Sequence, residues 1–286
     1  MESSNLGSVP EETLEEQHQQ DSSKPVFSAF ASRPDRPPTQ SSSQKYSPLD
    51  WAAYFDREED VCISDSNDVF HLYMAGKEGP VVFCLHGGGY SGMGGSVAVH
   101  VAAKKTLRSL AGLVVVDVVE GTAMASLIHM QKILSNRMQH FSSIEKAIEW
   151  SVRGGSLRNI DSARVSIPTT LSYDDSKQCY VYRARLEETE QYWRGWYEGL
   201  SEKFLSCPVP KVLLLAGTDR LDSRALTIGQ MQGKFQMVVV RHTGHAIQED
   251  VPDEFATLIL NFISRNRIGP HGVEIPGLGW RAQPRS

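Results

Sequence analysis

The sequence predicts a doubly wound, mostly parallel α/β sheet, and two observations carry this prediction. Short apolar runs of four to six residues recur along the chain, of the kind that is buried on both faces of a parallel sheet. Amphipathic stretches with helical spacing alternate with these runs, as in a chain that returns to one sheet through crossover helices. At 286 residues, with 40% apolar and 22% charged side chains, the chain is long enough for one such domain and a tail.

The expected domain occupies residues 48–268. Residues 1–47 are rich in Ser, Gln, Glu and Pro. They offer too little apolar surface to offset the entropy of ordering, so a disordered tail is expected there. A C-terminal tail is expected over residues 269–286.

The first expected elements are a β-hairpin, a buried strand and a helix. Strands at Val61–Ile63 and Val69–Tyr73 flank a turn at residues 65–68. The run Pro80–Leu85 is apolar throughout and is followed by glycines, which predicts a strand buried on both faces. Apolar residues at helical spacing predict a helix over Ser96–Leu110.

The rest of the chain continues this alternation. A buried strand, Leu113–Val116, closes on Asp117. A capping pattern with Ser142 at the N-cap and Glu145 three residues later predicts a helix that ends near Arg153. Further expected elements are strands at Val212–Leu215 and Gln236–Val240 and a final amphipathic helix from Pro252.

Lid-like helices are expected across residues of about 142–205. The stretch Arg185–Phe204 carries four aromatic residues at helical spacing, Tyr192, Trp193, Trp196 and Tyr197. A helical lid explains this spacing, and rings buried in the core explain it equally well.

Charge and composition limit the partners that are expected. The formal net charge is -5, so there is no basic field for nucleic acid. No apolar run approaches the roughly 20 residues of a membrane span. The four cysteines form no CxxC pair and follow no secretory apolar region, which favours the cytoplasm or the nucleus. No metal-ligand spacing is present, so neither a metal nor a cofactor is expected.

Glycines directly after the Pro80–Leu85 run suggest an anion-stabilising loop at His86–Gly89. Without a Cβ, glycines let backbone N–H groups approach a developing oxyanion. The pattern resembles the oxyanion loop of lipases and esterases. A plain glycine-rich turn or a phosphate loop is the alternative, although no GK[ST] or GxGxxG pattern follows.

A histidine near the C-terminus completes a second pattern. Gly244 and His245 lie between a late strand and the last helix, downstream of two acids, Asp117 and Asp219, that each follow a strand. Acid before histidine is the order of the catalytic triad in α/β-hydrolases, where the acid orients the imidazole. Position alone does not choose between the two acids.

Five blocks together resemble the protein phosphatase methylesterase 1 family. They are LHGGG (85–89), DVVEGTAM (117–124), NIDSARVS (159–166), LSCP (205–208) and LTIGQMQGKFQM (226–237). The resemblance implies an α/β-hydrolase fold and hydrolysis of the methyl ester on the C-terminal leucine of the protein phosphatase 2A catalytic subunit, which is the implied partner. It further implies Asp117 as the acid, His245 as the base, and oxyanion donors around Gly88 and Gly89.

The nucleophile is where the chain departs from this family. The family carries its serine in a Gly-His-Ser-Met-Gly-Gly elbow, whereas residues 90–96 of this chain read YSGMGGS. An internal deletion that joins the oxyanion loop to the second half of the elbow explains this junction and implies a truncated sheet. Ser91 or Ser96 would have to replace the lost serine, and Ser91 is the expected substitute. Val81–Leu85 is expected to fill the vacated sheet position.

Three interpretations follow from this departure. The chain is a methylesterase with little activity, a catalytically dead binding module for the phosphatase, or a chain that does not fold stably. A monomer is expected in the first two.

Overall fold

The computed structural model describes residues 45–87, 93–217 and 224–269, all within one compact unit, Gln40–Ser286. The strands are β1 (Arg57–Ile63), β2 (Asp68–Met74), β3 (Leu113–Val116), β4 (His140–Phe141), β5 (Leu171–Asp174), β6 (Cys179–Tyr182), β7 (Lys211–Leu215) and β8 (Gln236–Val239). The α-helices are α2 (Met93–Lys104), α3 (Glu120–Ser135), α4 (Ile144–Arg153), α5 (Ile160–Thr169), α6 (Glu190–Tyr197), α7 (Leu200–Ser206), α8 (Arg224–Met231), α9 (Ile247–Asp250) and α10 (Pro252–Arg265). Two 3-10 helices are η1 (Trp51–Ala53) and η3 (Leu186–Thr189). The expected tails lie almost entirely outside the described residues and stay predictions.

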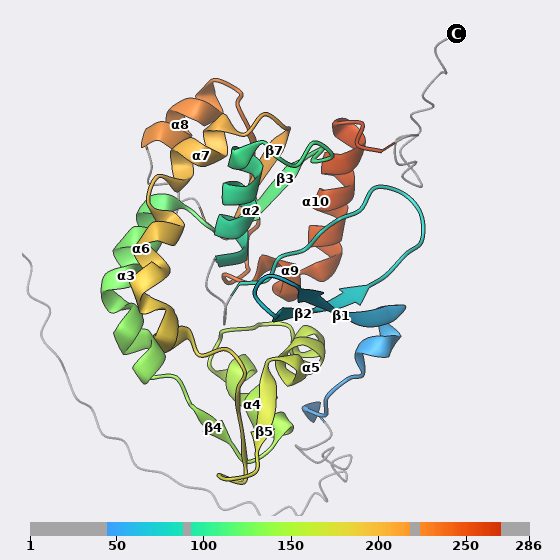
Figure 1. Ribbon diagram of the computed structural model, residues 1–286, viewed down its shortest axis with the longest axis vertical. Coiled ribbons are helices and arrows are strands. Elements are labelled where there is room, and N and C mark those ends of the chain that lie inside the picture. Colours follow the sequence, from blue (N-terminus) through green and yellow to red (C-terminus); the bar gives the residue numbers. More distant parts are fainter. Residues whose placement is uncertain (1–44, 88–92, 218–223, 270–286) are drawn as a thin grey trace, which may run out of the picture. The chain divides into compact units, whose positions relative to one another are not determined.

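A parallel sheet with the strand order β3-β7-β8 carries the main core (Figure 1). Along β7, Leu213 and Leu215 pack with residues of α2, α6, α7 and α8, whereas Val212 and Leu214 pack with Phe262 of α10. Successive side chains of a strand point to opposite faces, so helices cover both faces of this sheet. The doubly wound α/β prediction is confirmed, and its three strands lie within one residue of their expected bounds.

The apolar run Pro80–Leu85 is not a strand, contrary to the prediction. The side chains are exposed, with Val81 at 91% and Phe83 at 69% of their accessible surface. Among the described residues, β3 pairs with β7 alone, so Val81–Leu85 does not fill a position in the sheet. An apolar run forms a strand only where a neighbouring strand satisfies its backbone N–H and C=O groups.

The predicted N-terminal hairpin is present, but its first strand begins at Arg57 rather than at Val61. β1 and β2 pair antiparallel from Arg57 opposite Met74 to Ile63 opposite Asp68. In the turn, Asn67 takes a φ of 56°, a left-handed conformation that asparagine tolerates better than most residues.

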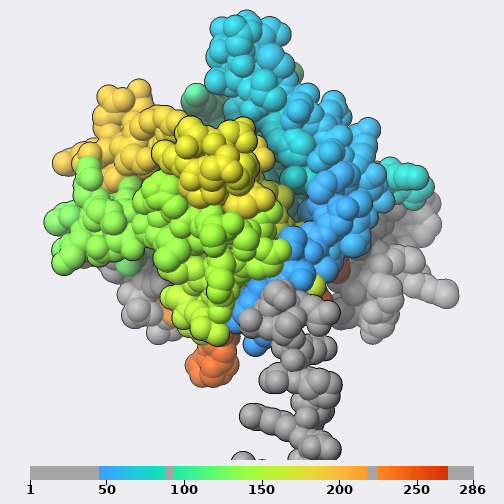
Figure 2. Space-filling view, turned by 90° about the horizontal axis from the view of Figure 1, so that it is seen from below, coloured from blue at the N-terminus to red at the C-terminus, as the bar shows by residue number. Residues whose placement is uncertain are grey.

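Residues 140–182 form a second core around an antiparallel sheet with the strand order β4-β6-β5. Phe141 and Ile148 are buried there together with Leu157 and Tyr46, so residues just before η1 contribute to this core. Figure 2 shows the described N-terminal residues, in blue and cyan, beside the green and yellow residues of this region. The sequence predicted helices in this region but not the sheet.

The N-cap of α4 is Ser143 rather than the predicted Ser142. Ser143 Oγ accepts the backbone N–H of Lys146 at 3.3 Å. Glu145 is therefore the second residue of the helix and not the third, so the reciprocal bond of a capping box is not made. The helix ends at Arg153 as predicted.

Two other helices differ from their predictions. α2 begins at Met93 and ends at Lys104 rather than spanning Ser96–Leu110, and Lys105 follows it with a left-handed φ of 57°. α3 was not predicted at all. None of its side chains is fully buried, so the apolar stripe that marks most helices in a sequence is weak there.

The aromatic stretch before β7 divides into η3, α6 and α7. α6 and α7 are separated at Gly199, which has a φ of 72°. This left-handed conformation favours glycine. Trp193 and Tyr197 are buried, while Tyr192 is exposed. The core interpretation therefore holds for two of these rings, and the lid stays a prediction.

Candidate active site

Asp117 lies directly after β3 and turns its side chain toward the end of β7. Its backbone takes a left-handed φ of 52°, an uncommon conformation outside glycine that aspartate and asparagine adopt more often than other residues. The Asp117 backbone N–H donates to the Leu214 carbonyl at 2.7 Å. The carboxylate is fully buried, and its Oδ1 accepts the backbone N–H of Ala216 at 2.9 Å. Both contacts hold the carboxylate at the carboxyl edge of the parallel sheet.

His245 meets this carboxylate, as the sequence predicted. The distance between His245 Nδ1 and Asp117 Oδ2 is 2.8 Å. An ionised carboxylate can only accept this bond, so Nδ1 carries the proton and Nε2 of the neutral ring is left as an acceptor. About a third of the His245 side chain is exposed, and within the described residues Nε2 has no hydrogen-bond partner. This arrangement suits a general base.

The turn that carries His245 is held at several points. Val240 follows β8 and donates its N–H to the Leu215 carbonyl at 2.8 Å. The Thr243 hydroxyl donates to the Val240 carbonyl at 3.0 Å, and Ala246 and Ile247 are buried. In open α/β sheets ligands bind at the carboxyl ends of the strands, which is where Asp117 and His245 meet.

The other predicted site residues cannot be placed. Gly88, Gly89 and Ser91, and the competing acid Asp219, lie outside the described residues. His86, which precedes the glycines, is described and exposed. The Leu85 and His86 carbonyls lie so close to Gly94 of α2 that a Cβ there would collide with both.

Ser96, the other serine considered as a nucleophile, is excluded by its surroundings. It is 1% exposed within α2, and its hydroxyl donates to the Trp196 carbonyl. His100, one turn later, is in hydrogen-bond contact with the same carbonyl at 3.2 Å. Because Ser96 faces the core under α6, it cannot meet a substrate at His245.

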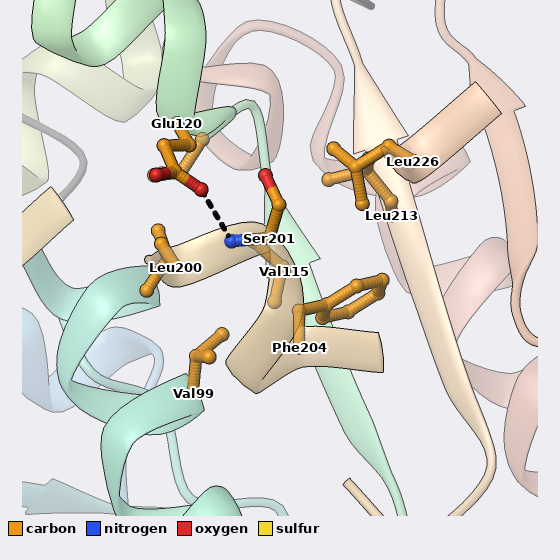
Figure 3. Close-up of a pocket in the computed structure, with 9 residues that line it drawn as sticks. Val99, Val115, Glu120, Leu200, Ser201, Phe204, Leu213 and Leu226 are labelled. Atoms are coloured by element: carbon orange, nitrogen blue, oxygen red, sulfur yellow. Dashed lines mark hydrogen bonds between the residues drawn. The ribbon is translucent and has the colours of Figure 1, made fainter. Parts of the chain in front are cut away.

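Glu120 and Ser201 line a small cavity beside the start of α7 (Figure 3). The Glu120 carboxylate accepts the backbone N–H groups of Gly199 at 2.7 Å and Ser201 at 2.8 Å. These contacts satisfy free N–H groups at the start of α7. The adjoining cavity of about 10 Å³ is lined mostly by apolar side chains and has the size of about one water molecule. It is too small for an ester substrate, so Glu120 has a structural role that the sequence did not reveal.

Within residues 45–87, 93–217 and 224–269, no group of three or more His, Cys, Asp or Glu side chains could hold a metal ion. Over the same residues, no helix is both long and apolar enough to cross a membrane.

Comparison with known families agrees with this geometry. Residues 27–258 match the family model described as "Alpha/beta hydrolase family". Among solved structures, the chain has a partial likeness to E-2-(acetamidomethylene)succinate hydrolase, with a TM-score of 0.48 and 19% identity over 60% of this chain and 63% of that chain. Because the family model matches more than half of the chain, the chain is an α/β-hydrolase, the class that its sheet and its acid–histidine pair indicate.

Curated relatives define the family more closely. Protein phosphatase methylesterase 1 of Rattus norvegicus is 35% identical over 346 residues, covering 81% of this chain and 89% of the relative. Probable protein phosphatase methylesterase 1 of Caenorhabditis elegans is 39% identical over 305 residues, covering 82% of this chain and 83% of the relative. Protein phosphatase methylesterase 1 of Yarrowia lipolytica is 47% identical over 175 residues, covering 61% of this chain and 42% of the relative. This chain belongs to the protein phosphatase methylesterase 1 family.

The alignment with the rat relative is longer than the chain itself. It runs over 346 positions but covers only 81% of the 286 residues, about 232, so roughly 346 − 232 = 114 positions of the relative have no counterpart here. The chain therefore lacks sequence that its relative contains.

Proposed function

We propose that this chain is directed at the methyl ester on the C-terminal leucine of the protein phosphatase 2A catalytic subunit, and that its reaction is hydrolysis of that ester. The observation that carries the proposal is the 2.8 Å contact between Asp117 and His245 in a chain of the methylesterase family. An acid that orients a histidine is the base half of a serine-hydrolase triad.

In the proposed reaction His245 acts through Nε2. It takes the proton of a serine hydroxyl as that oxygen attacks the ester carbonyl carbon, and Asp117 stabilises the imidazolium. Backbone N–H groups around Gly88 and Gly89 would hold the negative oxygen of the tetrahedral intermediate. Methanol leaves with the proton from His245. Water, deprotonated by His245, then attacks the acyl-enzyme and releases the free carboxylate and the serine.

The proposed reaction requires a serine hydroxyl near His245 Nε2. Ser96 is excluded by its burial, which leaves Ser91 as the substitute considered. Residues 87–91 would then have to present both the nucleophile and the oxyanion donors. Loss of one oxyanion donor alone costs roughly 10² to 10³ in rate. We infer that this chain turns the ester over far more slowly than full-length relatives.

A second candidate function is a binding module for the phosphatase that performs no hydrolysis. It is favoured by the stretch Met93–Ser96, which resembles the second half of the family's elbow but presents only a buried serine. The two candidates differ only in whether Ser91 reacts.

Labelling and capture distinguish these functions. The full chain and its Ser91→Ala variant would be treated with a fluorophosphonate probe, with Ser64→Ala, an exposed turn serine, as the matched control. The same proteins, immobilised, would be offered methylated protein phosphatase 2A. We expect capture of the phosphatase and weak labelling that Ser91→Ala abolishes and Ser64→Ala preserves. Capture without labelling identifies the binding module, and the absence of both overturns the proposed function.

A further inference from the structure

We propose that Asp250 is a positioning residue that sets the turn carrying His245, an inference that rests on the role proposed for His245 above. Asp250 is the last residue of α9, and its side chain is 1% exposed. Its Oδ2 accepts the backbone N–H of Gly244 at 2.6 Å. Hydrogen bonds to an ionised carboxylate are roughly twice as strong as those between neutral groups.

Asp250 holds the chain on both sides of His245. Its side chain binds the N–H of Gly244, and its own backbone N–H donates to the Ala246 carbonyl at 2.9 Å. The residues before and after the histidine are thereby bonded to one residue. Since the backbone that carries the imidazole limits where the ring can lie, these two bonds act together with the contacts of Val240 and Thr243 to position Nδ1 against Asp117.

The same contact explains why a glycine precedes His245. Gly244 does not have a left-handed φ, so its backbone conformation is open to other residues. Instead, a Cβ at this position would lie 3.2 Å from Asp250 Oδ2 and 3.8 Å from Arg158 Nε. Glycine is thus favoured by the close approach of the carboxylate, which a Cβ would push back by a few tenths of an ångström, and not by a turn conformation.

Asp250 also connects the turn to the region around α5. Its Oδ1 accepts the backbone N–H of Arg158 at 2.8 Å, directly before Asn159, the N-cap of α5. The neighbouring Glu249 accepts the hydroxyl of Ser166 at 2.6 Å, and burial raises the pKa of Glu249. Both acids contact the α5 region, and the Glu249 backbone N–H also donates to the Ala246 carbonyl, at 3.0 Å. The two differ in their side chains, because only the Asp250 carboxylate bonds to Gly244.

This difference makes Glu249→Gln a matched control for Asp250→Asn. An asparagine at 250 keeps one acceptor oxygen but turns an NH₂ group toward either Gly244 or Arg158, so one of the two bonds is lost. The other bond is weakened, because its acceptor is no longer charged. A glutamine at 249 can still accept the Ser166 hydroxyl. The readout is the downfield proton resonance of the His245 Nδ1–H bonded to Asp117, assigned by its loss in His245→Gln. Circular dichroism would confirm that each full-length variant is folded.

We expect Asp250→Asn to remove or broaden this resonance and Glu249→Gln to leave it unchanged. Gly244→Ala crowds the same contact from the other side and should also remove it, which keeps the test decisive if Asp250→Asn does not fold. An unchanged resonance in folded Asp250→Asn or Gly244→Ala, or its equal loss in Glu249→Gln, would overturn the inference. The resonance does not depend on ester turnover, so failure of the proposed function would leave this result unaffected.

Discussion

Two apolar runs of this chain, Val81–Leu85 and Val212–Leu215, are alike as sequences and opposite as structures. Each is a short, uncharged run that the sequence predicts as a buried strand. Val212–Leu215 is between 0 and 3% exposed and forms most of β7. Val81–Leu85 forms no strand, and Val81 is 91% exposed.

The difference lies in the neighbours of each run. β7 pairs with β3 on one side and β8 on the other, and its side chains meet helices on both faces. In the part of the chain that the structure describes, no strand pairs with Val81–Leu85. We propose that the unmatched positions of the relative include a strand and helices that would otherwise lie between this run and α2. Burial is therefore a property of the partners and not of the run alone.

The largest effect that we predict is at the centre of β7. Leu215→Ala removes a fully buried side chain and should lower the free energy of unfolding by about 2–5 kcal/mol. Chemical denaturation of the full chain would measure it. A loss below about 1 kcal/mol would mean that β7 is no better packed than Val81–Leu85, and the comparison would fail.

An intermediate effect is expected where Val81–Leu85 meets the rest of the fold. Gly94→Ala places a Cβ against the Leu85 and His86 carbonyls and should destabilise the protein by roughly 1–3 kcal/mol. Helix propensity alone predicts the opposite sign, a gain of about 1 kcal/mol. The sign of the change in thermal unfolding therefore shows whether this contact exists in solution.

The smallest effect is expected within the exposed run itself. Phe83→Ser should change the free energy of unfolding by no more than about 0.5 kcal/mol, because Phe83 is 69% exposed. If the ring were buried as in an intact sheet, its truncation would cost about 3–5 kcal/mol. Denaturation of this variant beside Leu215→Ala compares the two runs in one experiment.

The sequence predicted the elements whose signals are local. Strong periodicity or clear boundaries predicted the β1–β2 hairpin, the strands β3, β7 and β8, and the start of α10 at Pro252. The contact between Asp117 and His245 was also predicted. Residue order indicated an acid before the histidine, and the family resemblance selected Asp117 over Asp219. The predicted N-cap of α4 was wrong by one residue, because the adjacent Ser142 and Ser143 are equally suitable N-caps by sequence.

Features that depend on long-range contacts were missed. Glu120 reaches the start of α7 and Asp250 reaches the Arg158 backbone, and neither contact leaves a pattern in the sequence. The exposure of Val81–Leu85 was missed for the same reason, because a neighbour's absence is not encoded in the run itself. The β5–β6 hairpin was also overlooked, because β5, which reads LSYD, lacks the continuous apolar run that marked β3 and β7.

Demethylation of protein phosphatase 2A tests most directly whether this chain keeps the acid and the base but has lost an effective nucleophile. The full chain and the Caenorhabditis elegans relative would be compared at equal concentration on the methylated catalytic subunit, with methanol release as the measurement. Loss of a triad nucleophile costs on the order of 10⁶ in kcat, so turnover by this chain should be negligible beside that of the relative. Turnover within about a hundredfold of the relative would contradict this and show that a working nucleophile is present.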